Sequence, residues 1–227
     1  MSHTCLSWQR LAPWTDTRPG ELRYRLRCID KLGYTFRGDE RLLDVGCGNG
    51  GVSRLLRGRV AEVDAVDVEM STEWQDGPGF RFRVADGEQL PFDDASFDLV
   101  HSKDSLHHMD DPTRAVLEYR RVLKAGGTAL IVEANRHNPS LFVQMTLVRG
   151  HEHFTRHRFE DLVSTAFDDV RFGGFEAHFV PGASRPFGLQ HSVEEALERI
   201  GLVRSILSTT TPSPEPEPPS LPSRTSA

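Results

Sequence analysis

The sequence has few cysteines and no long hydrophobic run. Its three cysteines, Cys5, Cys28 and Cys47, follow neither a pairing pattern nor a metal-ligand spacing. They are therefore expected to be reduced thiols, and disulfides are not expected. No segment approaches the roughly 20 apolar residues of a membrane-spanning helix, and the N-terminus has no signal-peptide hydrophobic region. We expect a cytoplasmic protein without a membrane span.

An excess of basic residues is also missing. The formal net charge is −6 and the sequence pI is about 5.9, which argues against the broad basic surface of most nucleic-acid-binding proteins. Hydrophobic residues still make up 37% of the 227 residues, which is enough for a buried core and too much for a disordered chain. This length predicts one domain.

Strand-like segments alternate with helical ones through the middle of the chain. The predicted strands are Arg41–Val45, Ala61–Val68, Phe80–Val84, Phe97–His101 and Thr128–Ala134. Such alternation predicts an α/β fold with a mostly parallel central sheet and helices on both of its faces.

Helix signals flank and separate these strands. Pro19 begins an expected helix over residues 19–32. A second is expected from Asp111, as N-cap, and Pro112 to Lys124, where the Ala125–Gly127 break ends it. Further helices are expected over residues 138–147 and over residues 192–207. Between them, Thr155 is expected to cap a helix that buries Phe159, Leu162 and Val163.

The domain is expected to span residues 1–207, with residues 1–37 as an N-terminal helical cap and residues 38–180 as the core. Residues 208–227 are rich in Pro, Ser and Thr and nearly devoid of apolar side chains, so they predict a disordered tail. Whether Phe175–Val180 forms a terminal antiparallel strand is left open by the pattern.

The segment Leu42–Gly51 runs from an apolar strand into a glycine-rich turn and then into a helix. Glycines let the backbone bend sharply and approach a ligand, and the helix N-terminus offers free amide donors. Gly46, Gly48 and Gly51 also satisfy the dinucleotide-binding fingerprint, and Asp67 follows at the distance of a ribose-binding acid. The turn alone leaves the nucleotide ligand undecided.

Four segments in order resemble the class I S-adenosylmethionine-dependent methyltransferases, especially the small-molecule branch, over residues 38–180. They are Asp44–Gly50, Val63–Val68, Val84–Phe92 with Ser96–Asp98, and Leu106–Met109 with Asp111–Pro112 and Arg121–Gly127. The resemblance implies a Rossmann-like methyltransferase fold with S-adenosylmethionine as the cofactor and a methyl group as the transferred unit.

The same resemblance implies roles for individual residues. Asp44, Gly46 and Gly48 would hold the methionine end of the cofactor, and Asp67 would bind both ribose hydroxyls. The loop containing Asp86 and Gly87 would contact the adenine. Further expected cofactor contacts are Val68 and Lys103.

Methyl transfer from a sulfonium is an in-line displacement, so it needs alignment and no covalent enzyme intermediate. A hydroxyl acceptor benefits from a nearby base, for which histidine has the most suitable intrinsic pKa. His107 is the candidate base because its loop follows the fourth predicted strand at the mouth of the pocket. A structural role for His107 and its neighbour His108 is the alternative.

A second histidine cluster extends from His151 to His157 and includes Glu152 and His153. Its residue types suit a metal, but the spacing matches no established zinc pattern, and no metal ligand is predicted from it. Lining of the acceptor pocket and a solvated loop are the other interpretations.

The leading functional prediction is methyl transfer to a small-molecule acceptor, at oxygen in preference to nitrogen or carbon. The segment His101–Asp104 lacks the Asn/Asp-Pro-Pro-aromatic motif associated with methylation of base or glutamine amines, which disfavours nucleic-acid and protein-amine acceptors. Two alternatives remain: an NAD-dependent oxidoreductase, suggested by the glycine turn and Asp67, and a noncatalytic binding module that retains the fold. The acceptor and the oligomeric state are not predicted.

Overall fold

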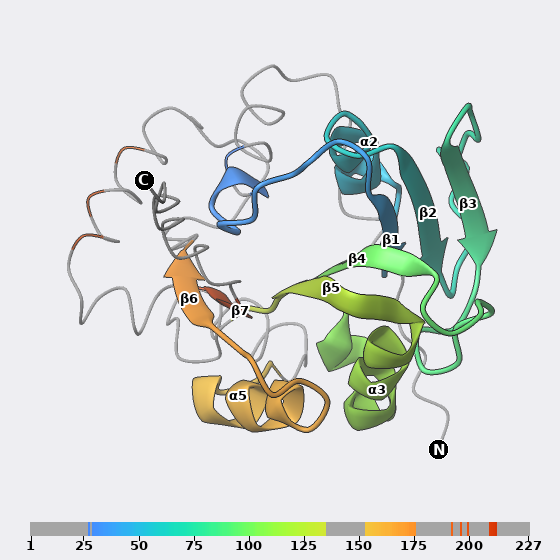
Figure 1. Ribbon diagram of the computed structural model, residues 1–227. Helices are drawn as coiled ribbons and strands as arrows, with labels where there is room; N and C mark the ends of the chain where they lie inside the picture. Colours follow the sequence, from blue (N-terminus) through green and yellow to red (C-terminus); the bar gives the residue numbers. More distant parts are fainter. Residues whose placement is uncertain are drawn as a thin grey trace, which may run out of the picture.

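The computed structural model contains a five-stranded, wholly parallel sheet with the order β3-β2-β1-β4-β5 (Figure 1). Its strands are β1 (Arg41–Val45), β2 (Glu62–Asp67), β3 (Phe80–Val84), β4 (Phe97–Lys103) and β5 (Leu123–Val132). The structure describes residues 29–134 and 153–175, together with Arg27, Ser192, Ala196, Arg199 and Thr209–Pro212. The predicted α/β fold with a mostly parallel sheet is thus confirmed.

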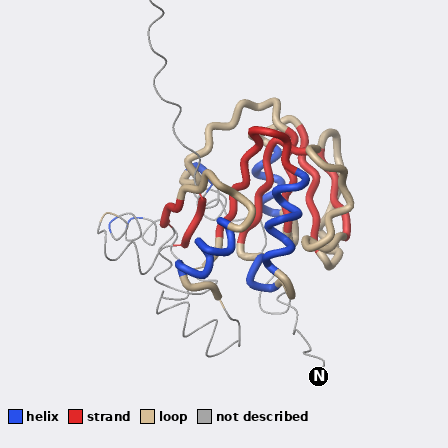
Figure 2. Tube along the Cα trace, turned by 60° about the horizontal axis from the view of Figure 1, so that its bottom comes forward, coloured by secondary structure: helices blue, strands red, loops and turns tan. Residues whose placement is uncertain are grey.

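Helices cover both faces of this sheet. Helix α2 (Gly51–Arg57) packs on one face, and helices α3 (Pro112–Val122) and α5 (Arg156–Ser164) pack on the other (Figure 1). Figure 2 shows the helices in blue and the strands in red from a second direction. Alternate side chains of each strand point to opposite faces, so Leu42 joins the core under α2 while Leu43 joins the core under α3. Among the described residues, no helix is both long enough and apolar enough to cross a bilayer.

The strand order reverses between β1 and β4, which lie side by side although β2 and β3 separate them in sequence. In open parallel sheets, ligands bind in the crevice beyond the carboxyl ends of the strands at such a switch point. The glycine turn after β1 and the His107 loop after β4 both leave the sheet at this edge.

Two predicted helix starts are confirmed in detail. The Asp111 side chain accepts hydrogen bonds from the backbone N–H groups of Thr113 and Arg114, both at 3.1 Å. The Thr155 hydroxyl accepts one from Arg158 N at 3.3 Å, and α5 buries Phe159, Leu162 and Val163 as expected. Both caps satisfy amide donors that a first helical turn leaves without intrahelical partners.

The end of α3 and the start of β5 differ from the prediction. The helix ends at Val122, two residues before Lys124, and β5 begins at Leu123 instead of Thr128. Leu123 is buried and pairs with Phe97 of β4, so tertiary packing overrides the break suggested by the glycines.

The prediction of a disordered tail is wrong for Thr209–Pro212. These residues form β7, which pairs antiparallel with β6 (Phe172–Phe175) in a second, two-stranded sheet. Strand β7 also lies near β5. A ladder uses backbone groups, which composition does not report, so a segment without apolar side chains can still be ordered.

Several segments discussed above fall wholly or mainly outside the described residues: the helices over 138–147 and 192–207, the undecided strand over 175–180, of which Phe175 alone is described, and the remainder of the tail. Of the predicted helix over 19–32, Arg27, Ile29 and Asp30 are helical, whereas Lys31 and Leu32 already form a turn.

Candidate active site

The turn between β1 and α2 requires glycine at particular positions. Gly46, Gly48 and Gly50 have φ angles of 75°, 56° and 78°, in the left-handed region that other residues rarely adopt. A side chain on Gly50 would collide with Phe82, whereas Gly48 is exposed and its Cβ direction meets only open space. With no side chain in the way at Gly48, the turn therefore lets a ligand approach its backbone closely.

Asp67, at the end of β2, faces this turn. Its Oδ2 accepts a hydrogen bond from Gly48 N at 2.8 Å, and its Oδ1 lies 3.3 Å from Glu69 N. The next residue, Val68, is 64% exposed and offers an apolar surface beside the carboxylate. A carboxylate next to exposed apolar surface suits the hydroxyls of a ribose and the face of its base.

Asp44 lies beneath the turn and is buried. Its Oδ1 is 2.7 Å from Nδ1 of His101 on β4, and its Oδ2 accepts a hydrogen bond from the Ser53 hydroxyl of α2. Asp44 thus connects β1, β4 and α2 under the glycine turn. Its contact with the methionine end of the cofactor stays a prediction.

The Asp86–Gly87 loop after β3 approaches the same edge. Asp86 is exposed, and its Oδ1 accepts a hydrogen bond from Glu88 N at 2.9 Å. Gly87 is buried, and an added Cβ would lie 2.7 Å from Met109 Cε and 3.0 Å from Val45 Cγ1. The loop is packed too closely for a larger residue, and its predicted adenine contact is not tested by this packing.

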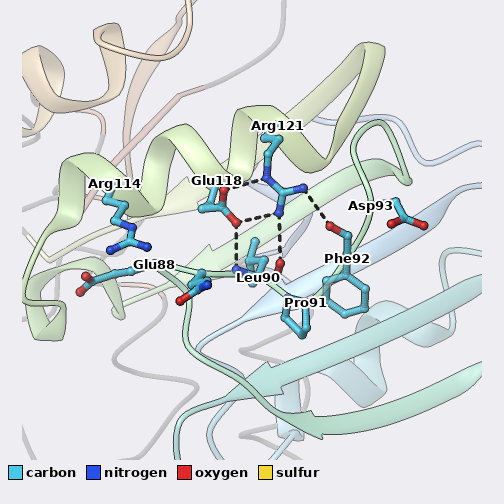
Figure 3. A pocket seen from close by; sticks show the side chains of 9 residues that line it. Glu88, Leu90, Pro91, Phe92, Asp93, Arg114, Glu118 and Arg121 are labelled. Atoms are coloured by element: carbon cyan, nitrogen blue, oxygen red, sulfur yellow. Dashed lines mark hydrogen bonds and ion pairs between the residues drawn. The ribbon is translucent and has the colours of Figure 1, made fainter.

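An arginine fixes the outer part of that loop to α3. Arg121 binds the Glu118 carboxylate with two 2.7 Å hydrogen bonds and donates to the carbonyls of Leu90 and Phe92 (Figure 3). These residues line a cavity of about 450 Å³ on the outer side of the loop. No residue of the glycine turn lines this cavity, so we assign its residues to bracing the loop and not to ligand binding.

Lys103 ends β4, and its Nζ lies 2.7 Å from Oδ2 of Asp104. Asp104 has a φ angle of 52°, an uncommon conformation for a residue with a side chain. The chain turns there toward the His107 loop. Contact of Lys103 with the cofactor stays a prediction.

His107 belongs to the 3-10 helix η2 (Leu106–His108), and its side chain is only 1% exposed. Its Nδ1 lies 2.7 Å from Oε2 of Glu133, the residue directly after β5, and Oε1 of Glu133 accepts hydrogen bonds from Ser105 N and Leu106 N. Burial alone would lower the pKa of His107, but the hydrogen bond and charge of Glu133 outweigh it and raise the pKa above its usual value.

The His107 loop touches the glycine turn directly. The Ser105 hydroxyl lies 3.4 Å from the Val45 carbonyl, and a side chain on Gly46 would occupy the position of the Ser105 side chain. The His107–Glu133 pair and the predicted cofactor turn therefore form one continuous site.

The sequence had named His153 only as part of the His151–His157 cluster, and the structure places it against His107, with ring centroids 4.3 Å apart. Sequence reasoning missed two other residues of this region. Glu133 could have been found as the acidic residue at the carboxyl end of a predicted strand. Trp74 stacks on Phe82 at 5.1 Å and donates from Nε1 to the Gly48 carbonyl at 2.8 Å, and no local sequence signal indicates this contact.

Comparisons with known proteins agree with this geometry. Residues 43–131 match the family model of a methyltransferase domain. A 27-O-demethylrifamycin SV methyltransferase from Amycolatopsis mediterranei is 32% identical over 126 residues, which are 50% of this chain and 46% of that protein. A sarcosine/dimethylglycine N-methyltransferase from Halorhodospira halochloris is 31% identical over 152 residues, which are 59% and 53% of the two chains. This chain thus spans about half the length of these relatives.

Among solved structures, the YcgJ protein from Bacillus subtilis superposes with a TM-score of 0.57 at 18% identity, over 86% of this chain and 100% of that chain. At this identity the likeness concerns the fold alone.

The fold, the glycine turn and the family match define a methyltransferase domain of the Rossmann-like class. Residues 43–131 thus form a methyltransferase domain similar to those of the class I S-adenosylmethionine-dependent methyltransferases, and S-adenosylmethionine is the methyl donor that this domain implies. The site fits that cofactor: Gly48 has no side chain to block close approach, Asp67 offers a carboxylate at the end of β2, and Val68 offers an exposed apolar face.

Proposed function

We propose that this chain transfers a methyl group from S-adenosylmethionine to a hydroxyl oxygen of a small-molecule acceptor, with His107 as the general base. The observation that carries the proposal is the His107–Glu133 pair, whose loop contacts the glycine turn through Ser105 and Gly46. The pair thereby lies beside the turn that is predicted to hold the methionine end of the cofactor, which carries the reacting methyl group.

The cofactor supplies an electrophilic methyl group on a sulfonium. Asp67 and the Gly48 backbone orient the nucleoside, and Asp44 holds the turn rigid from below. Glu133 fixes the His107 ring through Nδ1, so Nε2 is the nitrogen that takes the hydroxyl proton. The C–S bond breaks as the C–O bond forms, and the proton passes from His107 to water after the thioether product has formed.

Oxygen is favoured over nitrogen because a buried histidine oriented by a carboxylate is an arrangement for removing a proton from a weakly acidic group. The relatives include both kinds: one is named for methylation at oxygen and the other for methylation at nitrogen. Amine acceptors are therefore the second candidate class.

We place the reaction in the cytoplasm because three cysteines without a pairing pattern suit a reducing compartment. A small-molecule partner is favoured over a nucleic acid because the net charge of −6 disfavours binding to a polyanion.

The test begins with calorimetry of the full chain against S-adenosylmethionine, S-adenosylhomocysteine and NAD. S-adenosylmethionine and S-adenosylhomocysteine are expected to bind, and NAD is not. Binding of NAD alone would indicate an oxidoreductase. A matched panel of phenols, alcohols and amines, read by mass spectrometry for one added methyl group, then identifies the acceptor atom. Methylation confined to amines would contradict the oxygen assignment.

A further inference from the structure

Three side chains of metal-ligating types converge beside the proposed base. One ligand atom from each of His107, Glu133 and His153 lies within 4.8 Å of the other two. The side chains of His107 and Glu133 are each 1% exposed, and His153 is 4% exposed as a residue. The group is therefore enclosed by the fold and is not a chance cluster on the surface.

Each member is held by a different part of the chain. Glu133 is fixed by two backbone donors, Ser105 N at 3.0 Å and Leu106 N at 2.7 Å. Leu106 is fully buried and anchors η2, which carries His107. His153 precedes Phe154, whose side chain belongs to the core under α3 and α5. The three positions are thus set by tertiary packing before any ligand arrives.

The proposed general base explains only part of this arrangement. A carboxylate that orients one imidazole needs no second imidazole, yet His153 lies with its ring centroid 4.3 Å from that of His107. Buried charged groups are paired or coordinate metals, and two imidazoles with one carboxylate are a donor set typical of Zn²⁺ and related divalent ions.

The spacing is within reach of coordination. Zinc bonds of about 2.0 to 2.2 Å put neighbouring ligand atoms of a tetrahedral site about 3.4 Å apart. The 2.7 Å distance between His107 Nδ1 and Glu133 Oε2 would have to lengthen to reach this value. The largest distance between two ligand atoms of the group, which is at most 4.8 Å, would have to shorten. Both changes amount to about 1 Å, which small rotations of the side chains can supply.

We propose that His107, Glu133 and His153 bind one divalent transition-metal ion, of which Zn²⁺ is the model, and that this ion inhibits methyl transfer. Inhibition follows for either ring nitrogen of His107: a metal on Nε2 occupies the lone pair that accepts the proton, and a metal on Nδ1 leaves Nε2 as the protonated nitrogen of the neutral ring. This consequence rests on the proposed role of His107 as the base, whereas the binding itself does not.

Binding is measured first, on the full chain without cofactor or acceptor. After metal removal and titration with Zn²⁺, elemental analysis and competition with a chromophoric chelator give the stoichiometry and the dissociation constant. One ion per chain is expected. His153→Gln and Glu133→Gln should each weaken zinc binding at least tenfold. His157→Gln is the matched control, because His157 lies on the same segment with a side chain 87% exposed, and it should bind zinc as the parent does.

The absence of zinc binding to the parent chain, or equal affinities in the parent, His153→Gln and Glu133→Gln, would overturn the site. Since a substitution at a buried histidine could unfold the chain, the parent also gives an independent test. Zinc that binds the folded state must raise its melting temperature, and EDTA must reverse the shift. A melting temperature unaffected by zinc would also overturn the site.

Turnover is measured separately. Zinc at tenfold above its dissociation constant should reduce methyl transfer about tenfold, and EDTA should restore it. Tight zinc binding with unchanged turnover would overturn the inhibition and leave the site standing. Normal turnover of His107→Ala would instead contradict the proposed function.

Discussion

His107 Nδ1 and Glu133 Oε2 lie 2.7 Å apart at the ends of neighbouring strands β4 and β5, although 26 residues separate them in sequence. The carboxylate also accepts two backbone hydrogen bonds from the loop that carries the histidine. Glu133 therefore fixes both the ring of His107 and the path of its loop.

His107→Ala should lower methyl transfer by about 100- to 10,000-fold, because a positioned general base contributes that much. Glu133→Gln should cost less, since it leaves the base in place but weakens its orientation. If the two act as a unit, the double variant loses little more than His107→Ala alone. Steady-state kinetics of the single and double variants test this, and calorimetry with S-adenosylmethionine should show unchanged affinity for His107→Ala. Additive losses of activity in the double variant would show that His107 and Glu133 act independently.

Asp67→Ala should weaken S-adenosylmethionine binding about tenfold to hundredfold, because hydrogen bonds to a charged group contribute about 1.5 to 3 kcal/mol. Asp67→Asn should cost less because it keeps an acceptor. Calorimetry gives the dissociation constants, and Glu69→Gln, which removes a neighbouring charge, is the control. Parent-like affinity in Asp67→Ala would remove this residue from the cofactor site.

Trp74→Phe keeps an aromatic ring against Phe82 but removes the donor to the Gly48 carbonyl. We expect cofactor binding to weaken by about two- to tenfold, the effect of losing a neutral hydrogen bond of about 0.5 to 1.5 kcal/mol. The parent chain should also change its tryptophan fluorescence on binding S-adenosylhomocysteine, and this signal should be lost in Trp74→Phe. A signal that persists in the variant would have to come from Trp8 or Trp14.

The hydrogen bonds from Arg121 lower the pKa of Glu118. A carboxyl group whose pKa is lower in the folded state stabilises the fold above its unfolded pKa of about 4.3, and this stabilisation disappears as the pH falls through the folded pKa. Glu118→Gln should therefore lower the free energy of unfolding by about 1 to 3 kcal/mol at neutral pH and converge with the parent in acid.

Urea unfolding over a pH series measures this difference. The control is Glu160→Gln, which breaks the ion pair with Arg156 on the surface of α5 and should cost less than about 0.5 kcal/mol. A constant difference between Glu118→Gln and the parent at every pH would contradict the assignment to ionisation.

Removal of residues 209–227 deletes β7 and should destabilise the domain, because β6 loses its antiparallel partner. A loss of about 1 to 3 kcal/mol corresponds to a melting temperature lower by roughly 2 to 12 °C in a chain of this size. Removal of residues 213–227 is the matched control and should leave the melting temperature unchanged, since their composition offers little to bury. Equal melting temperatures for both truncations would show that β7 adds no stability.

The sequence alone determined those features whose physical cause is local. Positive φ angles restrict the turn at Gly46, Gly48 and Gly50 to glycine, the Asp111 and Thr155 caps satisfy amides within three residues, and the alternation of apolar segments marks the strands. Tertiary structure alone decided which distant groups meet. Glu133 reaches His107 because β4 and β5 are neighbours, and His153 and Trp74 arrive from loops whose paths no local pattern specifies. The β6–β7 ladder forms through backbone hydrogen bonds, which every residue except proline can donate, so side-chain composition could not reveal it.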